Sequence, residues 1–422
     1  MAQVCVVGAG YVGLTTASCL AQLGHTVVGI DVDAIKVDRL NSGLIPIVEE
    51  GLESITQQML EAKRLVFQHG YSDSIKAAEF IFLCVPTPQD EDGSADLTYI
   101  REAATSLMPY LASNSVIVNK STVPVGSTLV VEEIVRRDDI FVVSNPEFLR
   151  EGSAVHDFLH PDRIVVGSSN KKAAQRVADL YQSLNAQVII CDPASAETIK
   201  YAANAFLATK LSFANAIAAL CEHVGANIDD VMEGIGQDKR IGNQFLKPGP
   251  GWGGSCFPKD TRALVKIAES AGYDFELLRG VIDFNEIQFD RIVDKVRKAV
   301  GGNLAGKNIA VLGLTFKAHT NDLRDSPALR IVDQLKMQGA SINAFDPTVT
   351  KPLPQTNLCK TAIDACALAD AILIATEWPE FASLDPSEIG TVVQSKNMID
   401  ARNILDADLW RAAGFTYQGV GR

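Results

Sequence analysis

Residues 3–31 hold the sequence feature that most restricts how this chain can fold. An apolar run (QVCVV, 3–7) is followed by a glycine-rich turn (GAGYVG, 8–13) and then by apolar residues at helical spacing. Gly24 stands where such a helix is expected to end, and a second apolar run, HTVVGID, follows at 25–31. A strand, a tight turn, a helix and a strand in this order predict a βαβ unit, the beginning of a parallel, doubly wound sheet.

Three glycines in this turn, Gly8, Gly10 and Gly13, fit the pattern G-x-G-x-x-G. In that pattern the first glycine permits the turn, the second lets the backbone approach a pyrophosphate, and the third lets the helix pack on the strand. Asp31 ends the next strand, where a carboxylate accepts hydrogen bonds from ribose hydroxyls and repels a 2′-phosphate. The turn therefore predicts a dinucleotide site that prefers NAD to NADP; a glycine turn without a ligand is the alternative. Lys36 either reaches an adenosine-side phosphate or lies in solvent.

Further apolar runs predict more strands of a mostly parallel sheet. They lie at 79–85, 115–119, 140–144 and 164–167. Two of them lead into the segments 84–88 and 120–126, which contain prolines beside Thr and Ser. Ligands gather at the carboxyl ends of parallel strands in open α/β sheets. Both segments are therefore expected to be stiff loops that place hydroxyls at a ligand, although a purely structural turn is possible at each.

The end of the chain repeats its beginning. Runs at 308–315, 340–348, 368–378 and 397–402 echo the strands of the first region, but without three glycines. Between the two regions lie two proline-free helical stretches, 194–247 and 259–326, and the second predicts a helix of about 25 residues over 278–300. Such a helix either bridges domains or forms a dimer interface, or it is a plain core helix. The predicted fold is α/β, with two Rossmann-like doubly wound parallel-sheet domains, 1–193 and 303–422, joined by a central helical region, 194–302.

Composition narrows the class of protein. The net charge is −13, which argues against a nucleic-acid binder or a polybasic membrane protein. The eight cysteines form no CxxC pair and no metal-ligand spacing, so free thiols in a reducing compartment are expected and a metal site is not. Since no signal-peptide pattern precedes the first strand and no apolar run reaches membrane-spanning length, a cytoplasmic enzyme is the expectation.

One cysteine stands in a reactive context. Gly253 and Gly254 lead into Ser255, Cys256 and Phe257, and Pro258 suits the first turn of a helix. Cys256 is therefore expected at or just before a helix N-terminus, where the helix dipole and Lys259 favour the thiolate. Asp260, four residues on, is expected on the same helical face. A buried structural cysteine is the alternative reading.

Two pairs of residues share this four-residue spacing. Lys200 and Asn204 lie in a strongly helical stretch, and an ammonium and an amide on one face can stabilise an oxyanion. Glu147 and Glu151 follow the strand at 140–144 and are expected near the ligand edge of the sheet. Each pair could also be an ordinary solvated face.

The motifs together resemble one enzyme family. GAGYVG, STVPVGS, NPEFLREGSA, PDRIVVG, ETIKYAANAFLATKLSFAN, GGSCFPKD, GLTFK and RDSPAL occur in the order and at the spacing of the UDP-glucose 6-dehydrogenase family. The resemblance covers the whole chain. It implies an NAD-dependent four-electron oxidation of a sugar alcohol to the acid, with two NAD reduced for each UDP-glucose oxidised to UDP-glucuronate. Cys256 would carry a thiohemiacetal and then a thioester.

The resemblance also assigns roles to single residues. Lys200 and Asn204 would hold the oxyanion, Thr122 and Asp260 would position water or move protons, and Glu147 would assist hydrolysis. Which of Lys200, Asp260 and Glu147 is the base at each step stays open. The expected cofactor residues are Gly8, Gly10, Tyr11, Val12, Gly13, Asp31, Lys36, Val85, Pro86, Thr87, Ser121, Thr122, Glu151 and Arg324. The expected substrate residues are Phe148, Leu149, Arg150, Glu151, Lys200, Asn204, Arg240, Phe245, Leu246, Lys247, Gly253, Phe316, Lys317 and Arg402.

Several readings stay open beside this one. Arg240 resembles an arginine that such enzymes supply from the neighbouring subunit, which implies a homodimer or a higher homo-oligomer. The same chemistry could act on GDP-mannose or a UDP-N-acetylhexosamine. A two-electron dehydrogenase would need no nucleophilic cysteine, and a non-catalytic NAD-binding sensor would leave Lys200, Cys256 and Asp260 without a purpose.

Overall fold

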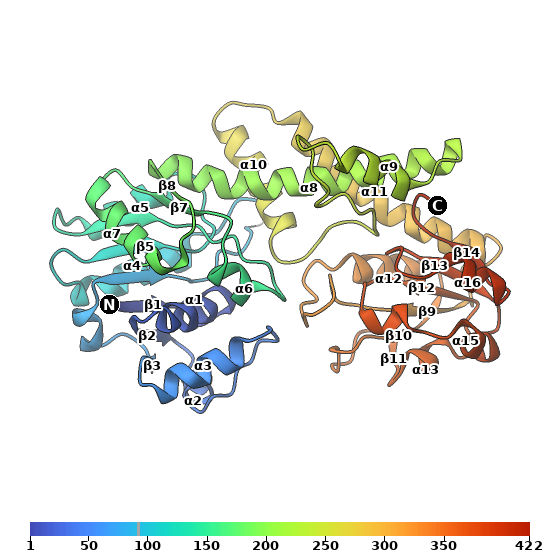
Figure 1. Cartoon of the computed structure of the whole chain (residues 1–422), viewed down its shortest axis with the longest axis horizontal. Helices are drawn as coiled ribbons and strands as arrows, with labels where there is room; N and C mark the ends of the chain where they lie inside the picture. The colour runs from blue at the N-terminus through green and yellow to red at the C-terminus, as the bar shows by residue number, and fades with distance from the viewer. Residues whose placement is uncertain (91–92) are drawn as a thin grey trace. The chain divides into compact units, whose positions relative to one another are not determined.

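The computed structural model describes residues 1–90 and 93–422, and these form two compact units. The first contains Met1–Ala203 and Arg262–Tyr273, and the second contains Asn204–Thr261 and Asp274–Arg422. Figure 1 shows one sheet among the blue to green segments and another among the orange to red segments. The two predicted parallel-sheet domains and the helical region in the middle of the chain are therefore confirmed.

The first unit is built on an eight-stranded sheet with the order β3-β2-β1-β4-β5-β6-β7-β8. The strands are β1 (Gln3–Val7), β2 (Thr26–Asp31), β3 (Leu65–His69), β4 (Phe80–Leu83), β5 (Val116–Asn119), β6 (Phe141–Ser144), β7 (Ile164–Gly167) and β8 (Val188–Cys191). Neighbouring strands run parallel, as in Val4 opposite both Val27 and Phe80. The exception is a single antiparallel pair, Ser144 with Gly167, between β6 and β7.

Helices cover both faces of this sheet because its strands are apolar on both faces. They are α1 (Tyr11–Gln22), α2 (Ala34–Asn41), α3 (Leu52–Glu61), α4 (Thr98–Leu107), α5 (Ser127–Val135), α6 (Ala154–Leu159) and α7 (Lys171–Asp179), with short 3₁₀ turns η1 (Asp73–Ala77), η2 (Met108–Tyr110) and η3 (Gln182–Leu184). Val4 and Val6 of β1 share a core with α1, α3, α6 and α7, whereas Cys5 and Val7 share one with α4 and α5. The sheet is therefore doubly wound, as predicted.

The second unit repeats the strand order of the first. Its order is β11-β10-β9-β12-β13-β14, and all of the pairs are parallel. The strands are β9 (Asn308–Leu312), β10 (Ser341–Phe345), β11 (Asn357–Leu358), β12 (Ala371–Ile374), β13 (Asn397–Asp400) and β14 (Thr416–Gln418). The helices are α9 (Ile228–Gly236), α11 (Glu276–Ala299), α12 (Pro327–Met337), α13 (Ala362–Cys366), α14 (Pro379–Ala382), α15 (Pro386–Val392) and α16 (Ala407–Ala412). The internal repeat is confirmed.

Two helices contribute residues to both units. They are α8 (Pro193–Val224) and α10 (Phe257–Ser270). The predicted helix of about 25 residues is confirmed as α11, which has 24. The helical pattern over 194–247 was too long, because Gly225 has a positive φ and the last helix of this stretch ends at Gly236.

The statement that no apolar run reaches membrane-spanning length was wrong for α8. This helix has 32 residues and is the one described helix long and apolar enough to cross a bilayer. Half of its most apolar window is buried inside the protein, and core helices of soluble proteins pass the same test.

Candidate active site

The glycine turn of the first unit leaves room where a dinucleotide is expected. Gly8 has a φ of +94°, and a Cβ there would lie 2.6 Å from the carbonyl oxygen of Cys84. A Cβ on Gly13 would lie 1.7 Å from the Gly8 oxygen, so both positions require glycine. At Gly10, in contrast, no described heavy atom lies within 4 Å of such a Cβ. Since α1 begins at Tyr11, free N–H groups of a helix N-terminus face this space, and the turn fits a pyrophosphate.

Asp31 lies at the end of β2 with its carboxylate already bonded. It accepts hydrogen bonds from the backbone N–H groups of Ala9 (2.9 Å) and Asp33 (3.0 Å), and it pairs with Lys36 Nζ at 2.9 Å. Burial acts to raise the pKa of Asp31, but Lys36 and the two N–H groups outweigh it and hold the pKa below its ordinary value. Lys36 is therefore neither free in solvent nor extended toward a phosphate: it covers the carboxylate that ribose hydroxyls would use.

The two proline-containing loops after β4 and β5 are tied to each other. Thr87 Oγ1 donates to the carbonyl oxygen of Thr122 at 2.9 Å, and Ser121 Oγ donates to that of Val85 at 2.6 Å. These hydroxyls therefore stiffen the ligand edge of the sheet instead of pointing away from it. Thr122 itself is buried.

Glu49 is a buried carboxylate that the sequence did not single out. It accepts hydrogen bonds from the N–H groups of Gly152 and Ala154, at 2.7 Å each, and from the hydroxyl of Tyr11. Burial, followed by Glu49, raises the pKa of Tyr11 well above its ordinary value. Glu49 thus fixes the turn that carries Glu151 to the first residue of α1. Glu49 belongs to none of the motifs in the sequence, so no sequence pattern pointed to it.

Glu147 and Lys200 form a buried ion pair of 2.9 Å in the first unit. Glu147 also accepts a hydrogen bond from the Leu149 N–H at 2.6 Å. Burial acts to raise the pKa of Glu147, but Lys200 outweighs it and keeps the carboxyl ionised. The Phe148 ring lies 5.5 Å from Lys200 Nζ and 3.7 Å from the Arg163 guanidinium.

The start of α8 is anchored to the loop after β5. The buried carboxylate of Glu197 accepts hydrogen bonds from the Gly126 N–H (2.7 Å) and from both the N–H (2.9 Å) and the hydroxyl (2.7 Å) of Thr128. Lys200 follows one turn later on the same helix. The loop that carries Thr122 and the helix that carries Lys200 are therefore joined by one carboxylate.

A second buried lysine lies at the same edge of the first sheet. Lys120 follows β5, donates to Asn145 Oδ1 at 3.1 Å, and lies 5.5 Å from the Tyr181 ring. Burial, with Lys200 as a smaller cause, lowers the pKa of Lys120 to about 8, although Cys84 and Glu147 act to raise it. Asn145 precedes Pro146 and Glu147, so this network supports the acidic loop.

Cys256 lies directly before α10 in the second unit, as predicted. The Asp260 N–H donates to the Cys256 carbonyl oxygen at 2.9 Å, and Ser255 Oγ lies 3.6 Å from the thiol sulfur. The buried Asp260 carboxylate accepts from Asn204 Nδ2 at 2.6 Å and pairs with Lys259 Nζ at 2.7 Å. Within this unit the structure therefore brings Asn204 and Asp260 into contact, one turn of helix from the thiol.

The glycines before Cys256 pack against the turn that follows β9. A Cβ on Gly253 would lie 2.0 Å from the Asp325 carbonyl oxygen, and one on Gly254 would lie 2.8 Å from the Phe316 ring. Arg402 donates to the carbonyl oxygens of Phe316 (3.1 Å) and Ala375 (2.9 Å). Gly253, Phe316 and Arg402, all expected at the sugar nucleotide, thus lie in one cluster.

The remaining predicted residues are more scattered. Arg240 is exposed and pairs with Asp238, and Arg324 is exposed and pairs with Asp322. Phe245 has a φ of +61°, and its ring lies 6.4 Å from that of Phe257, while Leu246 is buried.

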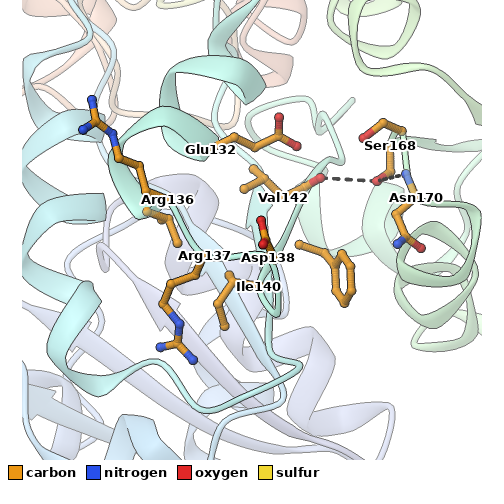
Figure 2. A pocket seen from close by; sticks show the side chains of 11 residues that line it. Glu132, Arg136, Arg137, Asp138, Ile140, Val142, Ser168 and Asn170 are labelled. Atoms are coloured by element: carbon orange, nitrogen blue, oxygen red, sulfur yellow. Dashed lines mark hydrogen bonds between the residues drawn. The ribbon is translucent and has the colours of Figure 1, made fainter.

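A pocket of about 280 Å³ lies elsewhere in the first unit (Figure 2). Its described lining comes from the end of α5, from β6 and from the segment between β7 and α7. Arg136 and Arg137 stand there beside Glu132 and Asp138, so opposite charges are mixed. None of the residues predicted for cofactor, substrate or catalysis lines it.

Comparison with known proteins identifies the family. Residues 2–185, 194–287 and 310–407 match the NAD binding, central and UDP binding domains of the UDP-glucose/GDP-mannose dehydrogenase family. UDP-glucose 6-dehydrogenase TuaD of Bacillus subtilis is 45% identical over 432 residues, covering 100% of this chain and 94% of its own. A UDP-glucose dehydrogenase structure from Pyrobaculum islandicum superposes with a TM-score of 0.92 at 36% identity, covering 100% of this chain and 98% of its own. A UDP-D-ManNAc dehydrogenase structure from Pyrococcus horikoshii superposes with a TM-score of 0.90 at 28% identity, covering 100% of this chain and 99% of its own.

These full-length similarities agree with the glycine turn, the aspartate of β2 and the thiol at α10. The chain is an NAD-dependent oxidoreductase that belongs to the UDP-glucose/GDP-mannose dehydrogenase family.

Proposed function

We propose that this protein oxidises UDP-glucose to UDP-glucuronate and reduces two NAD for each sugar. The observation that carries the proposal is Cys256 at the N-terminus of α10, in a chain that is similar over its full length to UDP-glucose 6-dehydrogenases. Oxidation of an alcohol to an aldehyde needs no nucleophilic thiol, whereas further oxidation of the aldehyde can proceed through one, so the position of Cys256 favours a four-electron reaction over a two-electron one.

The first unit would hold the cofactor at Gly8, Gly10 and Gly13, with Asp31 at the ribose. NAD, when bound, supplies the hydride acceptor for both oxidations, so that one alcohol, one water and two NAD⁺ give one carboxylate, two NADH and three protons. Lys36 would leave Asp31 for the ribose hydroxyls to take its place; the ion pair is one-third exposed on the lysine side, which makes this exchange inexpensive.

Cys256 would act between the two oxidations. Its thiolate adds to the C6 aldehyde carbon, and the new C–S bond gives a thiohemiacetal. Loss of the second hydride from that carbon leaves a thioester. Water then attacks the thioester carbon, the C–S bond breaks, and the carboxylate and the thiolate are released.

The charged neighbours would stabilise the oxygen that becomes negative. Lys200 pairs with Glu147, and Asn204 donates to Asp260, which fixes the orientation of its amide group. Both lie on α8, one helical turn apart, and an ammonium and an amide are donors suited to an oxyanion. Asp260 and Thr122 would orient the water, and Glu147 would assist hydrolysis.

The second unit would bind the sugar nucleotide. Its support is the cluster of Gly253, Phe316 and Arg402, in a region that matches the UDP binding domain of the family. Relatives of 42–45% identity are named as UDP-glucose enzymes, whereas the UDP-D-ManNAc enzyme is 28% identical, which favours glucose over an N-acetylhexosamine. Eight free thiols favour a reducing compartment, the cytoplasm.

A homodimer is also part of the proposal. Phe206, Phe213 and Leu220 recur every seven residues on α8 with their side chains at least half exposed, and Val224 continues the stripe. A heptad stripe of this kind suits a second copy of the same helix. Phe213→Glu should shift the sedimentation coefficient toward that of a monomer; an unchanged value would remove this face as the interface.

The direct test counts NADH for each UDP-glucose consumed. Two NADH supports the four-electron reaction, one supports a simple dehydrogenase, and none supports an NAD-binding sensor. Rates on UDP-glucose, GDP-mannose and a UDP-N-acetylhexosamine in the same assay decide the sugar.

A further inference from the structure

Three buried amide side chains hold the loop that leads to Cys256. Asn285 of α11 bonds both backbone groups of Trp252: the Trp252 N–H donates to Oδ1 at 2.8 Å, and Asn285 Nδ2 donates to the Trp252 oxygen at 2.9 Å. Gln288 Nε2 donates to the Gly249 oxygen at 2.7 Å, and the Gly249 N–H donates to Asn215 Oδ1 at 2.8 Å. Asn215, Asn285 and Gln288 are each at most 4% exposed. We call these three side chains the loop clamp.

The loop needs such a clamp because its own sequence gives it little order. Four of the six residues in 249–254 are glycine, and glycine loses more conformational freedom on ordering than any other residue. A Cβ on Gly251, whose φ is +121°, would lie 2.5 Å from the Phe289 ring and 3.0 Å from Asn285 Oδ1. The glycine therefore lets the backbone approach α11 closely enough to be bonded.

The clamp lies just upstream of the nucleophile. Trp252, which it holds, is four residues before Cys256, and α10 begins one residue after the thiol. Beyond the clamp, the Gly254 N–H donates to the Asp325 oxygen at 3.3 Å. The Trp252 indole N–H also donates to Ser212 Oγ at 2.9 Å. The path of the backbone into the thiol is thus determined by side chains of α8 and α11 that do not touch the thiol.

We propose that Asn285 is a positioning residue for Cys256, supported by Gln288 and Asn215. The amide of Asn285 sets where the loop enters α10 and so where the thiolate stands. This inference rests on the proposed function for its catalytic consequence, but not for its effect on the thiol. A misplacement of about 1 Å at a reacting atom can cost about 100-fold in rate.

Asn285→Ala tests this, with Asn41→Ala as the matched control. Asn41 makes the same pair of bonds elsewhere: Asn41 Nδ2 donates to the Phe67 oxygen at 2.8 Å, and the Phe67 N–H donates to Asn41 Oδ1 at 2.9 Å. For Asn285→Ala we expect kcat to fall about 100-fold with the KM for NAD unchanged. The rate at which iodoacetamide labels Cys256, measured by mass spectrometry of the Cys256 peptide, should change. Amide hydrogen exchange over 249–254 should become faster. Asn41→Ala should leave all of these values at those of the unmodified protein.

The proposal is overturned if Asn285→Ala labels, exchanges and turns over like Asn41→Ala. Gln288→Met provides a second variant that fills the same space: it removes one bond, and we expect about a tenfold loss in kcat. If Asn285→Ala does not fold, an unchanged labelling rate and kcat in Gln288→Met overturn the proposal. If the unmodified enzyme fails to release two NADH for each UDP-glucose, the proposed function fails, while the labelling and exchange experiments still decide the clamp.

Discussion

The second sheet repeats the order of the first six strands of the first sheet, and the two share one turn geometry, but they differ in the residues at that turn. Gly8 has a φ of +94° and its N–H donates to Ile30; Gly313 has a φ of +92° and its N–H donates to Phe345. Two residues after Gly8 comes Gly10, beside which there is open space, whereas two residues after Gly313 comes Thr315. The Thr315 hydroxyl donates to Asp346 at 3.1 Å, so the second turn carries a side chain bonded to the strand-end aspartate where the first turn carries none.

The aspartates that end the second strands show the same contrast. Asp31 is covered by Lys36, a flexible side chain that can leave. Asp346 is bonded by the backbone N–H groups of Leu314 and Thr315, by the Thr315 hydroxyl and by the Trp378 indole at 3.2 Å. In the first unit α1 begins directly after the turn, but in the second unit α12 begins only at Pro327. The same topology therefore supports two ligands because the ligand is chosen by the residues at the turn and not by the fold.

Cys256→Ser should have the largest effect and should separate the two units. Because the nucleophile is lost, turnover is expected to fall on the order of 10⁴-fold. The thiol lies in the unit of the second sheet, so the first unit should still bind NAD. Stopped-flow detection of NADH measures turnover, and calorimetric titration with NAD measures cofactor binding. Retained turnover in the serine variant would remove the covalent mechanism.

Lys120→Met should change the pH dependence of stability. Among the described residues the buried lysines, Lys120 and Lys200, lie in the first unit, and the position of Lys120 corresponds to the buried Ala401 of the second. The pKa of Lys120 is lowered from 10.5 to about 8, chiefly by burial. Between these values the unfolded chain holds a proton that the folded chain lacks, so the free energy of unfolding rises with pH in this window.

At 1.36 kcal/mol for each pH unit between the two values, the rise amounts to roughly 3 kcal/mol. The methionine variant should lose this rise. Urea unfolding of both proteins from pH 7.5 to 10.5 gives the difference, in which the titration of other groups cancels. Parallel curves would contradict a neutralised Lys120.

Gly10→Thr should convert the first turn toward the second. Gly10 has a φ of −78° and open space around it, so the fold should tolerate threonine within about 0.5 kcal/mol. The new side chain should weaken NAD binding by roughly 30- to 100-fold, the usual cost of a steric conflict. Thermal unfolding without NAD checks the first value, and calorimetry with NAD checks the second. Unchanged affinity would show that the cofactor does not approach Gly10.

Asp346→Asn should have the smallest effect on the cofactor. Both of its oxygens accept from backbone N–H groups, which cannot turn into acceptors, so placing an NH₂ group there should cost about 1–2 kcal/mol of stability. NAD affinity should stay unchanged, since this aspartate belongs to the second unit. A loss of NAD binding would mean that the two aspartates do not have separate roles.

The strands that the sequence predicted lie inside the two sheets, and the strands that it missed lie at their edges. The interior strands of both sheets, such as β1 and β12, follow from apolar runs, since their residues are buried on both faces. The four missed strands, β3, β8, β11 and β14, are the edges of the two sheets. Three of them, β3 (LVFQH), β11 (two residues) and β14 (three residues), are half exposed or very short and carry no continuous apolar signal. The fourth, β8 (VIIC), does carry an apolar run, and this strand was missed in spite of it.

The sequence by itself determined the repeated doubly wound topology, the open glycine turn and a cysteine at a helix start, because each depends on neighbours a few residues away. Only the tertiary structure decided that Glu49 holds the turn at 152 and that Asn285 clamps Trp252. These contacts join residues up to about a hundred positions apart. Polar side chains of this kind follow no period along the chain, and they are recognised only when folding buries them against one backbone group that needs a partner.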